Sequence, residues 1–230
     1  MSVALLRRTL AELVGTAFLV ATVIGSGIAA TRLSPGDVGL QLLENSLATG
    51  AVLVALILTL QPVSAAFNPV VSLAEWALGL LSLREAAVLA VGQVAGGVLG
   101  AVVANLMFDL DAVTFSTHER SGGGLWLGEV VATLGLLVVI FGAVHSGRTE
   151  TIAYGVGGWI TAAYWFTSST SFANPAVTIA RMFSDTFAGI EPASVPMFVL
   201  MQLVGAALAV ALVKLLYPVL VPTLVTEESR

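Results

Sequence analysis

The sequence contains no cysteine and few charged residues, and both shortages narrow the possible classes of protein. Without cysteine there is no disulfide, no thiolate nucleophile and no cysteine-ligated metal. Asp, Glu, Lys and Arg together make up 10% of the 230 residues, whereas a soluble domain has roughly 25%. The net charge of −5 is dispersed and no basic run occurs, so we expect no nucleic-acid partner.

Long apolar stretches dominate the chain instead, with 57% hydrophobic residues and a mean hydropathy of +0.99. Because a helix needs about 20 apolar residues to cross a bilayer, these stretches predict an all-α membrane protein with six transmembrane helices. They leave no room for a soluble domain, so we expect residues 1–230 to form a single transmembrane domain. The six stretches lie at 10–30, 40–60, 86–107, 125–144, 151–166 and 195–217.

The basic residues are distributed unequally between the two sides that six spans would define. Since basic residues concentrate in cytoplasmic loops, the asymmetry predicts a multi-pass protein of the cell (inner) membrane with both termini in the cytoplasm. One side carries Arg7, Arg8, Arg84, Arg148, Lys214 and Arg230, and the other carries Arg32, Arg120 and Arg181.

The two halves of the chain, at approximately 1–115 and 120–230, are related copies. Each half contributes three spans, so the second enters the membrane from the opposite side and the repeat is inverted. Three blocks match in the same order: AELVGTAFLV with GEVVATLGLLVV, FNPVVSLAEW with ANPAVTIARM, and GQVAGGVLGAVVANLMF with MQLVGAALAVALVKLLY.

Each half also contains an Asn-Pro motif, formed by Asn68, Pro69 and Val70 in the first half and by Asn174, Pro175 and Ala176 in the second. The apolar segments that follow, at 68–79 and 174–185, are too short to cross a bilayer and predict two re-entrant half-helices. Irregular backbone at membrane depth survives only where it is buried in protein or lines a cavity. The motifs therefore predict a polar path through the bundle.

The paired Asn-Pro motifs, the inverted repeat and an acidic residue in the first helix of each half resemble the aquaporin (major intrinsic protein) family over essentially the whole chain. The resemblance implies six transmembrane helices with two half-helices, and a passive channel with one pore per subunit. It also implies a homotetramer in the lipid bilayer. Val70 departs from the common motif, which has Ala at that place.

The motif chemistry supports a channel for uncharged solutes. An Asn at a helix N-cap can leave its amide NH₂ pointing into the pore, and Pro at the first helical position loses no hydrogen bond. Asn68 and Asn174 thus become donors at the membrane centre, where both half-helices also aim their positive ends. We expect neutral solutes to pass and ions to be excluded.

Glu12 and Glu129 are the acidic residues of the two first helices, where an unpartnered carboxylate is costly. The resemblance implies that each accepts hydrogen bonds from a re-entrant loop. The alternative function is an ion-coupled secondary transporter of a small neutral solute, in which these carboxylates carry the coupling ion. No His–Asp, Ser–His or metal-ligand pattern falls at the expected midplane, so we expect no enzyme activity, no cofactor and no metal.

In the family, a narrow constriction near the outer end of the pore acts as the selectivity filter. The residues aligned with this filter are where the sequence departs most from the family. Members selective for water or glycerol usually have Arg three residues after the second Asn, but here Val177 takes its place. Alignment with the family predicts three further filter residues: Thr49 on the second helix, Ser171 on the loop, and Ala162 on the fifth helix. Tyr164 is the alternative to Ala162. Such a filter would be wide, with two hydroxyl groups and no fixed charge.

Arg181 lies one helical turn beyond Val177 and is a candidate for a positive charge in the outer vestibule, although it could equally extend to lipid head groups or pair with Asp185. The combination resembles bacterial aquaglyceroporins associated with arsenic resistance. It implies water, glycerol, arsenite-like acids and methylated arsenicals as solutes.

Overall fold

The computed structural model describes residues 2–217, and these residues form helices and loops without a β-strand. The predicted all-α fold class is therefore confirmed. Residues 218–230, which end the second repeat and include Arg230, lie outside the described residues. The helices are α1 (Val3–Leu33), α2 (Val38–Leu60), α3 (Pro69–Ala77), α4 (Leu83–Met107), α5 (Gly123–His145), α6 (Ile152–Phe166), α7 (Pro175–Arg181) and α8 (Val195–Leu216), with a 3₁₀ turn at Thr149–Thr151.

Within residues 2–217, five helices are long and apolar enough to span a bilayer, namely α1, α2, α4, α5 and α8. The remaining expected span is α6, which has 15 residues and therefore measures about 22 Å at 1.5 Å per residue. The 3₁₀ turn before it continues the same stretch at its N-terminal end. Together these helices supply the six expected spans, and α3 and α7 are the two half-helices.

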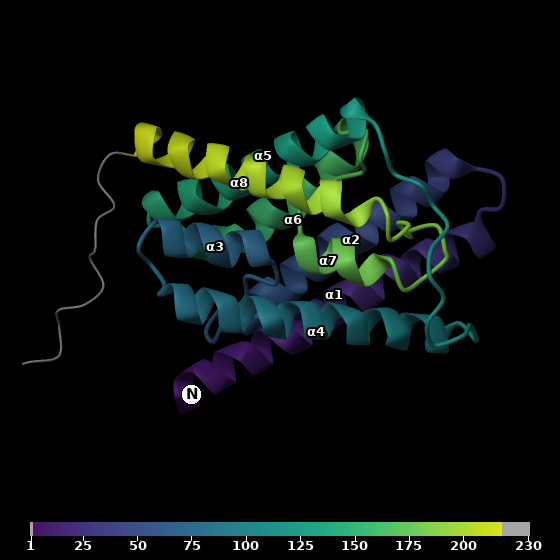
Figure 1. The fold of residues 1–230 in the computed structure, drawn as a ribbon, viewed down its shortest axis with the longest axis horizontal. Helices are drawn as coiled ribbons and strands as arrows, with labels where there is room; N and C mark the ends of the chain where they lie inside the picture. Colours follow the sequence, from purple (N-terminus) through teal and green to yellow (C-terminus); the bar gives the residue numbers. More distant parts are fainter. Residues whose placement is uncertain (1, 218–230) are drawn as a thin grey trace, which may run out of the picture.

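The two repeats are arranged as inverted copies. Helix α1 packs along α4 in the first repeat, and α5 packs along α8 in the second. Helices α2 and α6 contact each other across the boundary between the repeats. Figure 1 shows α3 and α7 between α4 and α8, with which both are in contact, and places the start of α1 and the end of α8 at the same end of the molecule.

Glycines allow the long helices to approach closely. A Cβ atom added at Gly96 or Gly100 on α4 would overlap the carbonyl oxygen of Leu13 or Ala17 on α1. At the equivalent contact of the second repeat, a Cβ at Gly205 on α8 would lie 2.6 Å from the carbonyl oxygen of Val130 on α5. Small residues at helix contacts are the usual means of tight packing in membranes. This packing holds the first helix of each repeat, and thus its carboxylate, in a fixed position.

Candidate pore and its lining

The half-helices α3 and α7 each begin at the Asn of an Asn-Pro motif. Asn68 and Asn174 have extended backbone, with φ of −155° and −158°, and a Pro follows each as the first helical residue. The Oδ1 atom of Asn68 accepts from the N–H of Val70 at 3.1 Å, and that of Asn174 accepts from Ala176 at 2.9 Å. Each side-chain oxygen therefore caps its own half-helix, and the amide nitrogen remains to bond elsewhere.

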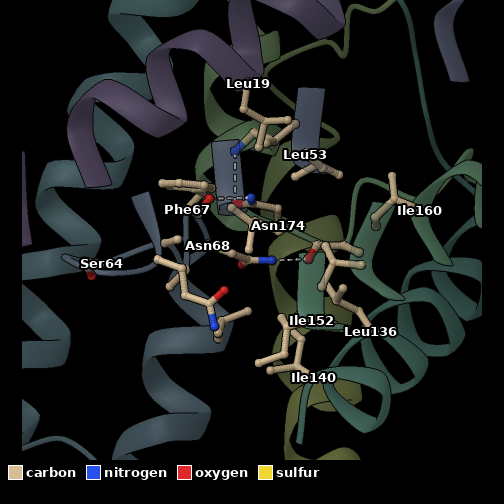
Figure 2. A pocket seen from close by; sticks show the side chains of 18 of the residues that line it. Leu19, Leu53, Ser64, Phe67, Asn68, Leu136, Ile140, Ile152, Ile160 and Asn174 are labelled. Carbon is tan, nitrogen blue, oxygen red and sulfur yellow. Dashed lines mark hydrogen bonds between the residues drawn. The ribbon is translucent and has the colours of Figure 1, made fainter. Parts of the chain in front are cut away.

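The amide nitrogens connect the two half-helices to each other. Asn68 Nδ2 donates to the carbonyl oxygen of Ala173 at 2.7 Å, and Asn174 Nδ2 donates to that of Phe67 at 2.7 Å (Figure 2). The sequence predicted that each amide NH₂ would point into the pore, whereas one N–H of each bonds to the opposite loop instead. An amide has two N–H groups, so the second one stays available to the cavity that both Asn residues line.

The residue before each Asn has an uncommon backbone conformation. Phe67 has φ of 50° and Ala173 has φ of 47°, a left-handed conformation that costs a non-glycine residue about 1–2 kcal/mol. It directs the Phe67 and Ala173 carbonyl groups at the opposite Asn. Such strain persists only where the surrounding contacts fix the backbone, and two buried carboxylates supply those contacts.

Glu12 and Glu129 hold the two strained loops in equivalent ways. Glu12 Oε2 accepts from the N–H of Phe67 at 2.6 Å, and Glu129 Oε2 accepts from the N–H of Ala173 at 2.9 Å. The second oxygen of each accepts from the preceding residue, Ala66 for Glu12 and Phe172 for Glu129, both at 2.9 Å. Each carboxylate thus binds two consecutive N–H groups of its loop.

A glutamine completes each network from the last helix of the repeat. Gln93 on α4 donates to Glu12 at 2.8 Å, and Gln202 on α8 donates to Glu129 at 2.5 Å. Ser64 adds a further donor to Glu12 at 2.5 Å. Both carboxylates are 0% exposed, and neither lines the cavity. Their contacts are those of structural anchors, which matches the role that the resemblance implied and leaves neither Glu12 nor Glu129 facing a coupling ion in the pore.

We expect Glu12→Gln and Glu129→Gln to reduce stability. Gln brings an NH₂ group against backbone N–H donors, so at least one buried donor is left unpaired at a loss of about 1–3 kcal/mol. The measurement is thermal unfolding of the purified protein in detergent. Glu150→Gln, at an exposed position, is the control and should unfold as the wild type does. Wild-type stability in both buried variants, with loss of uptake driven by a pH gradient, would instead favour the secondary transporter.

A cavity of about 290 Å³ runs past the two Asn residues. Residues near its one end come from α1 and α3, including Arg8 and Glu75, and residues near its other end include Ser171 and Arg181. Apolar side chains of α1, α2, α5 and α6 form one wall, and the re-entrant loops form the polar wall. Figure 2 shows the apolar wall at Leu19, Leu53, Leu136, Ile140, Ile152 and Ile160, around the central Asn68 and Asn174.

Three of the four predicted filter residues line this cavity: Thr49, Ser171 and Val177. Ala162 does not, because it is exposed on the outward face of α6. Tyr164 lines the cavity instead, and its hydroxyl lies 3.2 Å from Thr49 Oγ1. The choice of Ala162 over Tyr164 is therefore wrong. The physical reason is helical periodicity, since Ile160 and Tyr164 are four residues apart and share a face that residue 162 cannot share.

Arg181 is buried, at 3% exposure, and lines the cavity from the last turn of α7. Its guanidinium lies over the Phe172 ring, 3.4 Å from the centroid, and its Nε donates to the carbonyl oxygen of Ala188. It does not pair with Asp185, which is exposed and accepts from the backbone N–H of Thr117 at 2.8 Å. That hydrogen bond lowers the pKa of the Asp185 carboxyl. Of the alternatives for Arg181, these contacts favour the vestibule over lipid head groups or Asp185.

Glu75 is a lining residue that the sequence reasoning missed. It lies seven residues after Asn68, just as Arg181 lies seven residues after Asn174. Val71 lies three residues after Asn68, and Val177 lies three residues after Asn174. Both also line the cavity. The internal repeat carried this signal, because matching the two half-helices residue by residue aligns Glu75 with Arg181.

Comparisons with known proteins agree with this geometry. The profile of the Major intrinsic protein family matches residues 1–153 and 145–228. The chain is 48% identical over 211 residues to aquaglyceroporin AqpS of Rhizobium meliloti (strain 1021), covering 91% of this chain and 90% of that protein. It is 29% identical over 237 residues to aquaporin AqpM of Methanothermobacter marburgensis, covering 90% of this chain and 96% of the other. The X-ray structure of the aquaglyceroporin from Plasmodium falciparum superposes with a TM-score of 0.72 at 18% identity, covering 93% of this chain and 98% of that one.

This chain belongs to the major intrinsic protein family, the aquaporins, and has the aquaporin fold. It is a multi-pass membrane protein and a passive channel, and it is not an enzyme.

Proposed function

We propose that this protein conducts small uncharged solutes that are wider than water, through a filter formed by Thr49, Tyr164, Ser171 and Val177. The solutes are neutral polyols such as glycerol, trivalent metalloid acids and methylated arsenicals, with water passing as well. The observation that carries the proposal is Val177, which lines the cavity where water- and glycerol-selective relatives usually have Arg. An apolar wall at this place accommodates a methyl group, and a desolvated guanidinium would not.

The rest of the filter supports the same solutes. Thr49 Oγ1 donates to the carbonyl oxygen of Asn45 at 2.9 Å and lies 3.2 Å from the Tyr164 hydroxyl. The lone pairs that remain on the Tyr164 hydroxyl can accept from a polyhydroxylated solute and replace part of its hydration. The similarity to aquaglyceroporin AqpS favours solutes larger than water. A pocket that combines apolar walls with a few polar groups suits a solute that has both an apolar and a polar side.

We further propose that the protein is a homotetramer in the inner membrane with both termini in the cytoplasm. Large apolar side chains such as Leu99, Leu106, Leu203 and Leu208 are exposed on the outer surfaces of α4 and α8, where lipid or a neighbouring subunit would cover them. Arg7 and Arg8 lie near the start of α1, on the side that the distribution of basic residues assigns to the cytoplasm.

The test is solute flux into proteoliposomes, measured side by side for water, glycerol, arsenite and a methylated arsenical. We expect downhill flux of all four above that of empty liposomes, without dependence on a proton or sodium gradient. Flux of water alone would contradict the wide filter. Uphill accumulation driven by an ion gradient would contradict the passive channel.

A further inference from the structure

Glu75 lies near the end of α3 and is the acidic residue of the cavity wall. Among residues 2–217, the cavity is lined by two basic side chains, those of Arg8 and Arg181, and by no Asp or Glu other than Glu75. The carboxyl group of Glu75 forms no hydrogen bond or ion pair with any group of these residues, and its oxygens keep accessible surface. The group is thus left to act on whatever passes through the cavity.

The basic side chain nearest to this end of the cavity is paired with another carboxylate. Arg8 lies on α1, and its Nη1 is 3.6 Å from Glu85 Oε1 on α4. Arg8 and Glu12 are the charged groups whose fields act on Glu75. The helices packed against α3 add four more ionisable groups, namely Arg84 and Glu85 on α4, Arg181 on α7 and Lys214 on α8. None of them lies within 4.0 Å of the Glu75 carboxyl group in the described part of the chain.

The other charges along the cavity favour anions. The first N–H groups of α3, which begins at Asn68, place a partial positive charge at the membrane centre. The guanidinium of Arg181 adds a full positive charge toward the other end. Attraction between charges is screened much less at a partly buried site than between exposed groups. These groups repel cations, but they would draw small anions into a pore whose α3 end carried no negative charge.

We propose that Glu75 is the residue that excludes small anions from this pore. An anion that crosses the cavity must pass the Glu75 carboxylate, which repels it, whereas an uncharged solute meets only a hydrogen-bond acceptor. Protonation of the carboxylate removes its charge, so anion exclusion is present at high pH and is lost as the pH falls and the group takes up a proton. The inference goes beyond the proposed function, because it does not depend on which uncharged solutes pass.

The experiment measures chloride conductance in planar bilayers that contain the full chain, with a potassium chloride gradient across them. Glu75→Gln keeps the size of the side chain and removes its charge. At about pH 8, where glutamate carboxyl groups are normally ionised, we expect this variant to conduct chloride about tenfold or more above the wild type, with a reversal potential displaced toward that of chloride. Acidification of both compartments to about pH 4 should make the wild type conduct chloride and leave the variant nearly unchanged.

Glu150→Gln is the matched control. It makes the same change of charge at an exposed position in the 3₁₀ turn before α6, and Glu150 does not line the cavity. Its chloride conductance should equal that of the wild type at every pH. Glu75→Asp, which keeps the carboxylate, should also exclude chloride at about pH 8.

Water permeability of proteoliposomes reports whether each variant has folded, and Glu75→Ala is the second uncharged variant if Glu75→Gln fails to fold. A folded uncharged variant that excludes chloride as well as the wild type does would overturn the inference. Equal conduction of potassium and chloride would also overturn it, because the substitution would then have loosened the pore without regard to charge. If neither variant folds, the wild type decides, and its failure to gain chloride conductance on acidification counts against Glu75. Absence of glycerol and arsenite flux in the wild type would overturn only the proposed function.

Discussion

Asn68→Asp and Asn174→Asp are expected to make the pore leak cations and to weaken the contact between the half-helices. Each amide NH₂ donates to a carbonyl oxygen of the opposite loop at 2.7 Å. An aspartate at either position has only acceptor oxygens, so one of them would face that carbonyl oxygen without a proton between them. The lost hydrogen bond should lower stability by about 1–3 kcal/mol. The new negative charge would lie in the cavity wall and attract cations.

The measurement is ion conductance in planar bilayers, combined with thermal unfolding in detergent. Asn105→Asp is the matched control, because Asn105 is also buried and donates to the carbonyl oxygens of Ala112 and Phe183, but does not line the cavity. The control should lose stability without gaining conductance. If both pore variants remain as impermeable to cations as the wild type, the two Asn residues do not control ion exclusion.

The fold could be predicted because its signals are local and repeated. Apolar stretches near the thickness of a bilayer marked the spans, and the two Asn-Pro motifs marked the starts of α3 and α7. The inverted repeat then limited how these elements could be arranged. The resemblance to the family also implied that Glu12 and Glu129 anchor the re-entrant loops, and an acidic residue inside a membrane helix needs partners. Both have those partners in the structure.

The parts that could not be predicted depend on the path of irregular backbone. The loop between α6 and Asn174 contains left-handed residues at Thr170, Ser171 and Ala173. Glycine is the usual sequence signal for this conformation. None of the three is glycine, so the sequence gives no signal for the backbone path of the loop. Counting back from Asn174 without a gap in this loop selected Ala162 as the filter residue. The residue that faces the cavity is Tyr164, two positions later. The hydrogen bonds from each Asn to the opposite loop were missed for the same reason, because they require carbonyl groups that this backbone redirects.

The ionisable residues at the two ends of the cavity, Arg181 and Glu75, could be predicted only in part. The sequence did indicate Arg181, but its partner was uncertain because Phe172 and Ala188 approach it only through the folded loops. Glu75 was predictable, since the repeat aligns it with Arg181. At equivalent positions the two half-helices thus carry an acidic and a basic residue, a difference between the two ends of the cavity that the shared motif alone does not contain.

Val177→Arg should reduce the passage of wide solutes much more than the passage of water. The introduced guanidinium would enter the cavity beside Thr49, Tyr164 and Ser171 and narrow it, and it would have to be desolvated to contact a methyl group. It would also lie one turn from Arg181 on the same helix face, where like charges repel. We expect passage of a methylated arsenical to fall by about tenfold or more, which corresponds to about 1.4 kcal/mol. Thr49→Phe should act similarly by adding bulk and by removing the hydroxyl group beside Tyr164.

The comparison is proteoliposome uptake of water, glycerol, arsenite and a methylated arsenical at matched protein density. Val177→Ala, which keeps an apolar wall and adds space, is the control and should pass the wide solutes at least as well as the wild type. If Val177→Arg lowers water uptake alone and leaves the wide solutes unaffected, Val177 is not part of the filter. Selectivity would then have to arise elsewhere along the cavity, and the next place to examine would be the α7 end, where Ser171 and Arg181 line the same cavity.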